Sequence, residues 1–316
     1  MPLVKLARDR LLASIPTLIA VSLIVFFLAR ATSIDPVVQI LGQTASSADR
    51  AQLAQQLGLN DSLIAQYWRW LTDAVRGDLG ESFFTHLSVS TTIMERLSVT
   101  LSIVAVATLL AVVVGVGLGI VGATRPGSFV DNVLSTGIIS GLALPSFWLA
   151  MLLALFFGVQ LGWFPAVGFV PIGEDFVGWL RTVTLPAVAL AVPAGAVFAR
   201  QMRSSLIETL DKDYVVTLLA RGVNPRRILF SYAVKNALVP LLSVVSIQVA
   251  IMIGASFVVE TVFGIQGLGT YLIDAIVKGD YPALEGAALA VGLVVIIVNF
   301  VVDIAYGVAN PKVRPQ

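Results

Sequence analysis

The sequence predicts an all-α polytopic membrane protein with six transmembrane helices, and three observations lead to that fold class. Apolar residues make up 57% of the 316 residues and charged residues only 12%, whereas soluble domains carry about 25% charge. The mean hydropathy of +0.92 is correspondingly high. Uncharged runs long enough to cross a bilayer alternate with segments that hold the charges. We expect one membrane domain, 1–316, with a long polar loop at about 32–96 and a basic loop at about 201–235.

Each predicted span is a charge-free run, and about 20 residues suffice to cross the hydrocarbon. The first run follows Lys5, Arg8 and Arg10 and is longer than the core of a secretory signal, so we interpret it as an uncleaved helix. Pro145 lies inside the third span, where it frees backbone groups and predicts a kink. The six spans are 11–28, 97–123, 132–160, 182–199, 236–259 and 286–302.

Two further features concern packing and the loop after the first span. Gly115 and Gly119 form a small-xxx-small pair, which allows close approach of a neighbouring helix.

The sequence of the loop at 32–96 predicts one short helix near 48–57 and an aromatic-rich helix that begins at Asn60 as its N-cap and ends before Gly77. The clustered aromatic side chains of this second helix indicate that it lies at a membrane–water interface.

The positions of Lys and Arg predict the orientation. With the N-terminus inside, most of the 20 basic residues fall in segments on the inner side. The positive-inside rule therefore places both termini and the basic loop in the cytoplasm, and the long loop at 32–96 outside.

The basic loop contains a predicted helix, break and second helix at residues 213–227, which we call the elbow. Gly222 can take the left-handed conformation that ends a helix. Asn224 and Pro225 are suited to restart one, as N-cap and first helical residue. A basic segment of two short helices on one face of a membrane protein favours a role in binding a partner. The alternative is a solvated loop whose positive charge only sets the topology.

Few residues are suited to catalysis or metal binding. The chain has no cysteine and a single histidine, His86, in a polar loop, so a thiol nucleophile and an HExxH zinc helix are excluded. A GxxxxGK[ST] phosphate loop is also absent from the sequence. We therefore predict no catalytic, metal or cofactor site on this chain. The polar residues at or near membrane depth are candidates for the transport pathway or for helix packing: Gln248, Glu260, Asn299 and Asp303.

The elbow carries a resemblance to a known family. It contains Asp213-Tyr-Val-Val-Thr-Leu-Leu-Ala-Arg-Gly222 and Asn224-Pro-Arg-Arg227, with Lys235-Asn-Ala-Leu-Val-Pro240 following. This resembles the cytoplasmic EAA loop of binding-protein-dependent ABC importers, and more narrowly that of peptide/nickel permeases. Further matching strings run through nearly the whole chain, including Leu57-Gly-Leu-Asn60, Tyr67-Trp-Arg-Trp70, Arg76-Gly-Asp-Leu-Gly80, Leu144-Pro-Ser-Phe-Trp148, Gln160-Leu-Gly-Trp-Phe-Pro165, Val259-Glu-Thr-Val-Phe-Gly264 and Asp280-Tyr-Pro282. The long first loop looks like that of the first of two permease subunits.

The resemblance implies a permease subunit, not itself an enzyme, of an ATP-driven importer in the bacterial cytoplasmic membrane. It would pair with a second homologous permease, two cytoplasmic ATPases that hold ATP and Mg, and an external binding protein; no nucleic acid is involved. The residues expected to couple this chain to the ATPases are Asp213, Tyr214, Thr217, Leu218, Ala220, Arg221, Gly222, Arg226 and Arg227. Val216, Thr217 and Leu218 occupy the Glu-Ala-Ala positions, so a contact from a motif Glu is not expected.

Other functions remain open at this point. Short peptides are the favoured substrate, with nickel chelates, glutathione and sugar oligomers as alternatives. From a different class, an ion-coupled secondary transporter would need buried acidic residues near the bilayer midplane and often inverted repeats, which the sequence does not clearly contain. A structural membrane scaffold would have no need of the elbow.

Overall fold

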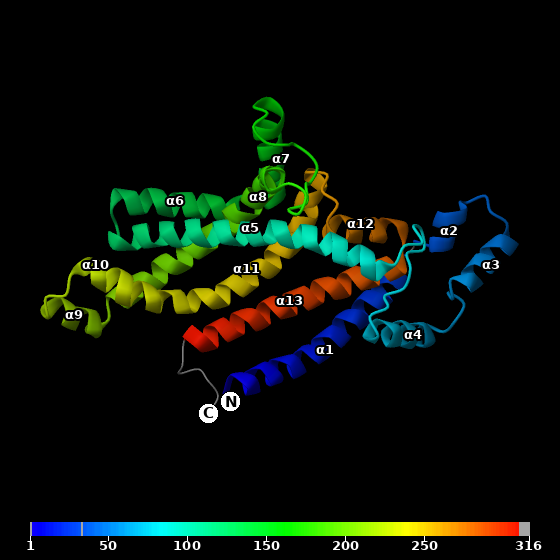
Figure 1. Cartoon of the computed structure of the whole chain (residues 1–316), viewed down its shortest axis with the longest axis horizontal. Coiled ribbons are helices and arrows are strands. Elements are labelled where there is room, and N and C mark those ends of the chain that lie inside the picture. Colours follow the sequence, from blue (N-terminus) through cyan, green and yellow to red (C-terminus); the bar gives the residue numbers. More distant parts are fainter. Residues whose placement is uncertain (1, 33, 310–316) are drawn as a thin grey trace. The chain divides into compact units, whose positions relative to one another are not determined.

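The computed structural model describes residues 2–32 and 34–309, and its regular structure there is helical. In this part of the chain, five helices are long and apolar enough to cross a membrane, and the bent pair Phe129–Ala143 and Ser146–Gln160, taken as one span, is the sixth. This confirms the predicted fold class. The chain divides into two compact units, and three of the four boundaries fall inside long helices. Figure 1 labels the helices of both units.

The first unit is built on 101–265, with short pieces from both chain ends. Its helices are the larger part of α5 (Val89–Thr124), α6 (Phe129–Ala143), α7 (Ser146–Leu153), α8 (Phe176–Leu210), α9 (Asp213–Ala220), α10 (Pro225–Arg227) and α11 (Val234–Val262). Helix α8 is central, because 67% of its most apolar stretch is buried, against at most 33% in the other long spans. Two π-helical segments, Ala154–Gln160 and Ile228–Ala233, continue α7 and α10.

The third predicted span is broken more sharply than a kink. Helix α6 ends at Ala143, and α7 begins at Ser146 at an angle of 97° to it. Leu144 and Pro145 between them are extended, because the residue before a proline is disfavoured in the helical region. The loop that follows the π-helical segment Ala154–Gln160 is ordered, as expected, and Gly168 N donates to Phe263 O at 2.9 Å.

The second unit comprises Asp9–Thr100 and Gln266–Ile296. It holds most of α1 (Pro2–Ala31), α2 (Pro36–Leu41), α3 (Ser47–Gln56), α4 (Leu63–Val75), the start of α5, α12 (Leu268–Lys278) and the first part of α13 (Tyr281–Ala309). Val89, Ile93, Leu268, Ala283 and Ala287 lie in its apolar core, which joins α5, α12 and α13. Asp280 ties the loop before α5 to this core, since it accepts bonds from the Ser82 hydroxyl and the Phe83 amide.

The start of the aromatic-rich loop helix was predicted wrongly. The N-cap of α4 is Ser62, whose hydroxyl accepts from Ala65 N at 3.3 Å, and Asn60 lies in the preceding turn. Both residue types cap helices, and the turn that follows Gly58 moves the start two residues on. The small helices α2 and α12 were not predicted.

Candidate functional site

The break in the elbow has the geometry that the sequence predicts. Gly222 has φ +77°, which places it in the left-handed region. Gly222 N donates to Leu219 O at 2.9 Å and Val223 N donates to Leu218 O at 3.1 Å. These two bonds form a Schellman motif, which satisfies the last carbonyls of α9 and reverses the chain direction. No atom lies within 4 Å of the place where a Cβ on Gly222 would stand, so the glycine serves the backbone conformation alone.

The second helix of the elbow restarts at Asn224 as expected. Its side-chain Oδ1 accepts from Arg226 N at 2.9 Å, and Pro225 takes the first helical position. The helix then passes through the π-helical segment Ile228–Ala233 into α11, so that 225–262 forms one continuous span. The elbow is therefore continuous with a membrane helix on its C-terminal side. On its N-terminal side only Asp211 and Lys212 separate α9 from α8.

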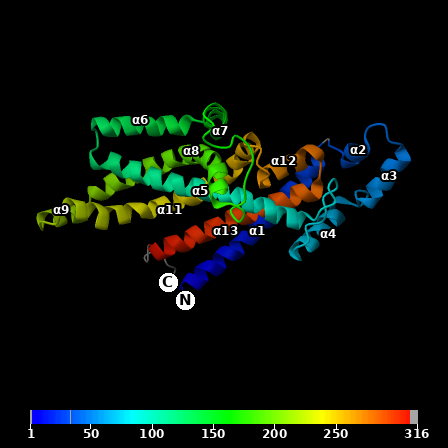
Figure 2. The same cartoon turned by 45° about the horizontal axis from the view of Figure 1, so that its top comes forward.

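An apolar core lies at the base of the elbow. Ala123 of α5, Met202 and Leu206 of α8, Ala233 of the π-helical segment and Ala237 of α11 form one buried cluster. Val215 in the elbow and Ile228 directly after it are also buried, at 4% and 2% exposed. In addition, Asn236 Nδ2 donates to the Tyr214 hydroxyl at 3.3 Å and to Tyr232 O at 3.0 Å. Figures 1 and 2 show α9 and α10 at the same end of the helices as the α5–α6 turn.

The predicted coupling residues are mostly on the outer side of the elbow. Leu218 is half-buried and Tyr214 is 36% exposed. The remaining predicted residues are exposed: Asp213, Thr217, Ala220, Arg221, Gly222, Arg226 and Arg227. The structure adds Val216 and Leu219, which are 60% and 50% exposed and stand three residues apart. Their i, i+3 spacing, which places both on one face of a short helix, is the sequence signal that could have identified them.

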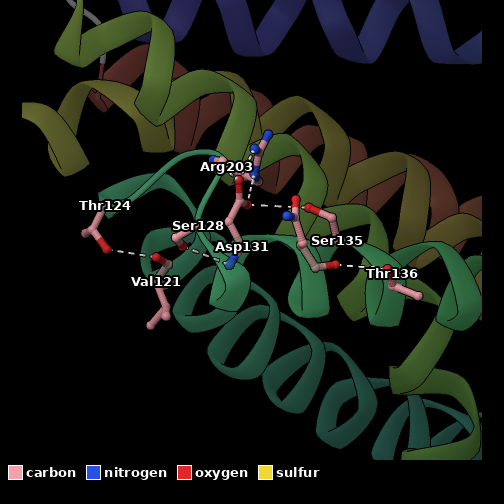
Figure 3. Close-up of polar contacts among 9 residues, drawn as sticks. Val121, Thr124, Ser128, Asp131, Ser135, Thr136 and Arg203 are labelled. Atoms are coloured by element: carbon pink, nitrogen blue, oxygen red, sulfur yellow. Dashed lines mark hydrogen bonds and ion pairs between the residues drawn. The ribbon is translucent and has the colours of Figure 1, made fainter.

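A partly buried ion pair, which sequence reasoning missed, joins α6 to α8 (Figure 3). Arg203 of α8 donates through Nε to Asp131 Oδ1 at 2.6 Å and through Nη2 to Asp131 Oδ2 at 2.7 Å. Asp131 lies in the first turn of α6, where Ser128 Oγ caps its amide at 3.2 Å. Gly127 N donates to Asp131 Oδ2 at 2.9 Å. In the sequence, Arg203 is one of the basic residues of the inner segments that predict the topology.

The polar residues predicted within the spans lie in different surroundings. Gln248 is 7% exposed and Glu260 is fully buried, both on α11. Asn299 is exposed and Asp303 is half-buried, both on α13. Within the described residues, no group of three or more His, Cys, Asp or Glu side chains could hold a metal ion.

Comparisons with known proteins point in one direction. A family model described as "Binding-protein-dependent transport system inner membrane component" matches residues 115–315, and its N-terminal companion matches 3–104. The chain is 37% identical over 305 residues to a probable peptide ABC transporter permease protein, y4tP, of Sinorhizobium fredii, covering 96% of this chain and 97% of that protein. It is 35% identical to the di/tripeptide transport system permease protein DppB of Pseudomonas aeruginosa, with 96% of each chain covered. With the oligopeptide transport system permease protein AppB of Bacillus subtilis the identity is 34%, over 96% of this chain and 98% of that one.

A solved structure has the same fold. A chain of the MetNI methionine ABC transporter, in an inward-facing conformation, superimposes with a TM-score of 0.58 at 19% identity. The match covers 69% of this chain and 96% of that chain. At this sequence identity, the match shows only that the two chains share a fold.

Proposed function

This chain belongs to the family of binding-protein-dependent transport system inner membrane components and is a permease subunit of an ATP-driven importer, and we propose short peptides as its substrate. One observation carries the substrate assignment. The relatives that match nearly the whole chain at 34–37% identity bear names that refer to peptides, dipeptides or tripeptides, and oligopeptides. Nickel chelates and glutathione are the alternatives that an analysis of the bound ligand would separate from peptides.

We assign the elbow to coupling with cytoplasmic ATPases, which hold ATP and Mg. Helix α9 is anchored on its inner side through Val215, while Val216 and Leu219 are exposed. Exposed apolar residues on a short helix fit a groove in a partner, and the flanking Arg221, Arg226 and Arg227 fit an acidic rim around it. Because α9 is separated from α8 by two residues and leads through α10 into α11, a displacement of α9 acts on two membrane helices.

The rest of the assembly follows from the same assignment. We infer that 1–316 acts as one permease domain in a bacterial cytoplasmic membrane, with both termini and 201–235 in the cytoplasm and 32–96 outside. A second homologous permease completes the pathway, and an external binding protein delivers the substrate. Buried Gln248 and Glu260 are assigned to packing. Exposed Asn299 remains the candidate for contact with the pathway or the second permease, and Asp303 stays a candidate for either role.

The coupling role of the elbow is tested with Gly222→Val. A β-branched residue at φ +77° costs on the order of 1–3 kcal/mol, because the backbone there disfavours it, and the site has no neighbour to clash with. We expect the variant to reach the membrane at normal levels. It should retain less of the ATPases in a pull-down, or its ATP hydrolysis in liposomes should no longer be stimulated by substrate. Gly222→Asn is the matched control, since asparagine tolerates the left-handed region.

A charge test complements the backbone test. Arg221→Glu reverses an exposed charge beside the break and is expected to weaken retention of the ATPases. Wild-type coupling in both Gly222→Val and Arg221→Glu would contradict the proposal and reduce the elbow to a topology signal. The substrate is identified separately, by mass spectrometry of the ligand that co-purifies with the external binding protein. A nickel chelate or glutathione in that fraction would overturn the peptide assignment.

A further inference from the structure

The ion pair between Asp131 and Arg203 joins the α5–α6 hairpin to α8, seven residues before α8 ends at Leu210 (Figure 3). The two bonds run in parallel, from Nε to Oδ1 and from Nη2 to Oδ2. A bidentate pair of this kind sets the relative orientation of two groups as well as their separation. The Asp131 side chain is 3% exposed and that of Arg203 is 30% exposed, so the carboxylate depends on its protein partners.

Helix α5 also contributes to this junction. A Cβ at Gly122 would stand 3.3 Å from Asp131 Oδ1 and 3.4 Å from Arg203 Cδ. Gly122 therefore leaves room for the pair against the end of α5. Three helices, α5, α6 and α8, meet at one charged contact next to the apolar cluster that supports the elbow.

Helix α6 has a second close contact with α8, just before the break at Leu144 and Pro145. A Cβ at Gly141 would stand 3.2 Å from the Cβ of Ala196. Just beyond this contact, at Leu144 and Pro145, the span turns by 97° into α7. Helix α7 packs against both α8 and α11, the two helices that the elbow connects. A displacement of α8 therefore moves both halves of the broken span, α6 and α7, provided that α6 moves together with α8.

We propose that Asp131 and Arg203 are positioning residues for transport, which clamp the α5–α6 hairpin to α8 so that a displacement of the elbow moves the broken span α6–α7 together with α8. The proposal rests on the coupling role of the elbow. The contact around Gly141, where Ile138 packs with Ala196 and Ala199, is apolar, and apolar contacts are non-directional. The two-point ion pair holds orientation and register, which force transmission through α6 requires.

The first experiment separates coupling from assembly. The complete complex, with both permeases, the ATPases and the binding protein, is reconstituted in proteoliposomes, and uptake of a radiolabelled dipeptide per ATP hydrolysed is measured. In Asp131→Asn the side chain keeps an oxygen for the Gly127 amide but loses its charge, and Arg203→Gln removes the guanidinium. We expect either variant to assemble normally and to lower this ratio about tenfold, within the range usual for coupling between sites. Arg200→Gln, an exposed arginine one turn earlier on α8, is the matched control and keeps the wild-type ratio.

A second experiment tests whether the clamp stays closed during the cycle. Because the chain contains no cysteine, Asp131→Cys and Arg203→Cys can be combined and joined by a bifunctional thiol reagent whose reach matches the ion pair. We expect the reduced double variant to be uncoupled and the cross-linked form of the same preparation to regain coupling. Loss of uptake on cross-linking would mean that the contact must open, and would overturn the proposal.

The remaining outcomes are equally decisive. A wild-type ratio in Asp131→Asn or Arg203→Gln would overturn the clamp, and so would a double variant that assembles only when cross-linked, since the pair would then be purely structural. If instead the elbow has no coupling role, Gly222→Val and Arg221→Glu would both show wild-type binding and stimulation of the ATPases. That result is distinct from a failure of the clamp. ATP hydrolysis stimulated by the ligand-loaded binding protein is recorded in parallel. A wild-type complex that shows this stimulation but takes up no dipeptide would overturn the peptide assignment alone.

Discussion

At the scale of single residues, Arg30 illustrates how a charge is accommodated near the end of a membrane helix. Its side chain is 13% exposed and forms an ion pair with Glu285, which is 3% exposed. Arg30 Nε donates to Gln66 Oε1 and Nη1 donates to Phe26 O, each at 3.1 Å. The guanidinium carbon also lies 3.4 Å from the centroid of the Phe26 ring. The charge is compensated from α1, α4 and α13 at once, which ties these helices together within their unit.

Removal of Glu285 is therefore expected to destabilise the protein strongly. Glu285→Ala leaves the guanidinium of Arg30 without its carboxylate in a largely buried position, at a cost of about 3–5 kcal/mol. The measurement is the midpoint of thermal unfolding of the purified complex in one detergent. Asp61→Ala is the matched control, because the Arg69–Asp61 pair is about half exposed on both sides and such pairs contribute about 0–1 kcal/mol. Equal midpoints for the two variants would contradict the prediction.

At the scale of helices, the small-residue pair on α5 determines how closely α5 approaches α8. A Cβ at Gly115 would stand 2.5 Å from the backbone oxygen of Gly195. At Gly119 it would stand 2.7 Å from the backbone oxygen of Ala199. Both distances are below van der Waals contact, so only glycine fits while the backbones stay in place. The structure thus confirms the close helix contact that Gly115 and Gly119 predict.

A single methyl group is enough to test this contact. Gly115→Ala forces the α5 and α8 backbones apart, and we expect a loss of about 1–3 kcal/mol of stability. Gly117→Ala on the same helix has no atom within 4 Å of the new methyl group and is expected to leave stability unchanged. Unfolding midpoints and the yield of monodisperse complex in detergent report both effects. A stable Gly115→Ala variant would show that the two helices can separate without cost.

At the scale of the whole molecule, the inferred orientation assigns the long loop and the elbow to opposite sides of the membrane. The positive-inside rule supports that orientation through the excess of Lys and Arg at the chain ends and in 201–235. Two exposed positions allow a direct test, Gln55 on α3 and Ser204 on α8. The absence of cysteine from the sequence makes each introduced thiol unique.

We expect a thiol at Gln55→Cys to react with a membrane-impermeant reagent applied to spheroplasts, and a thiol at Ser204→Cys to stay unlabelled. After permeabilisation both are expected to react, which serves as the control for accessibility. Labelling of Ser204→Cys in sealed spheroplasts would reverse the assigned orientation. It would also place the elbow on the side without ATP.

The sequence by itself determined the features that depend on neighbouring residues. Charge-free runs located every span, because burial in lipid requires about 20 apolar residues in succession. The break at Gly222 and the restart at Asn224 and Pro225 were predictable, since the left-handed region and the N-cap each favour particular residue types. The spans were predicted too short, as 182–199 lies within α8 (Phe176–Leu210), because hydropathy marks the hydrocarbon and the helix continues into polar residues.

Only the tertiary structure decided which distant residues meet. Arg30 and Glu285 are 255 residues apart, and Asp131 and Arg203 are 72 apart. No local pattern distinguishes these charges from solvated ones, since each pairing depends on the relative placement of helices that pack through their apolar surfaces. The 97° turn at Pro145 was predicted only as a kink, because a proline frees backbone groups but the packing of α7 against α8 and α11 sets the angle. Local sequence specifies where a helix stops, and packing specifies where the next one points.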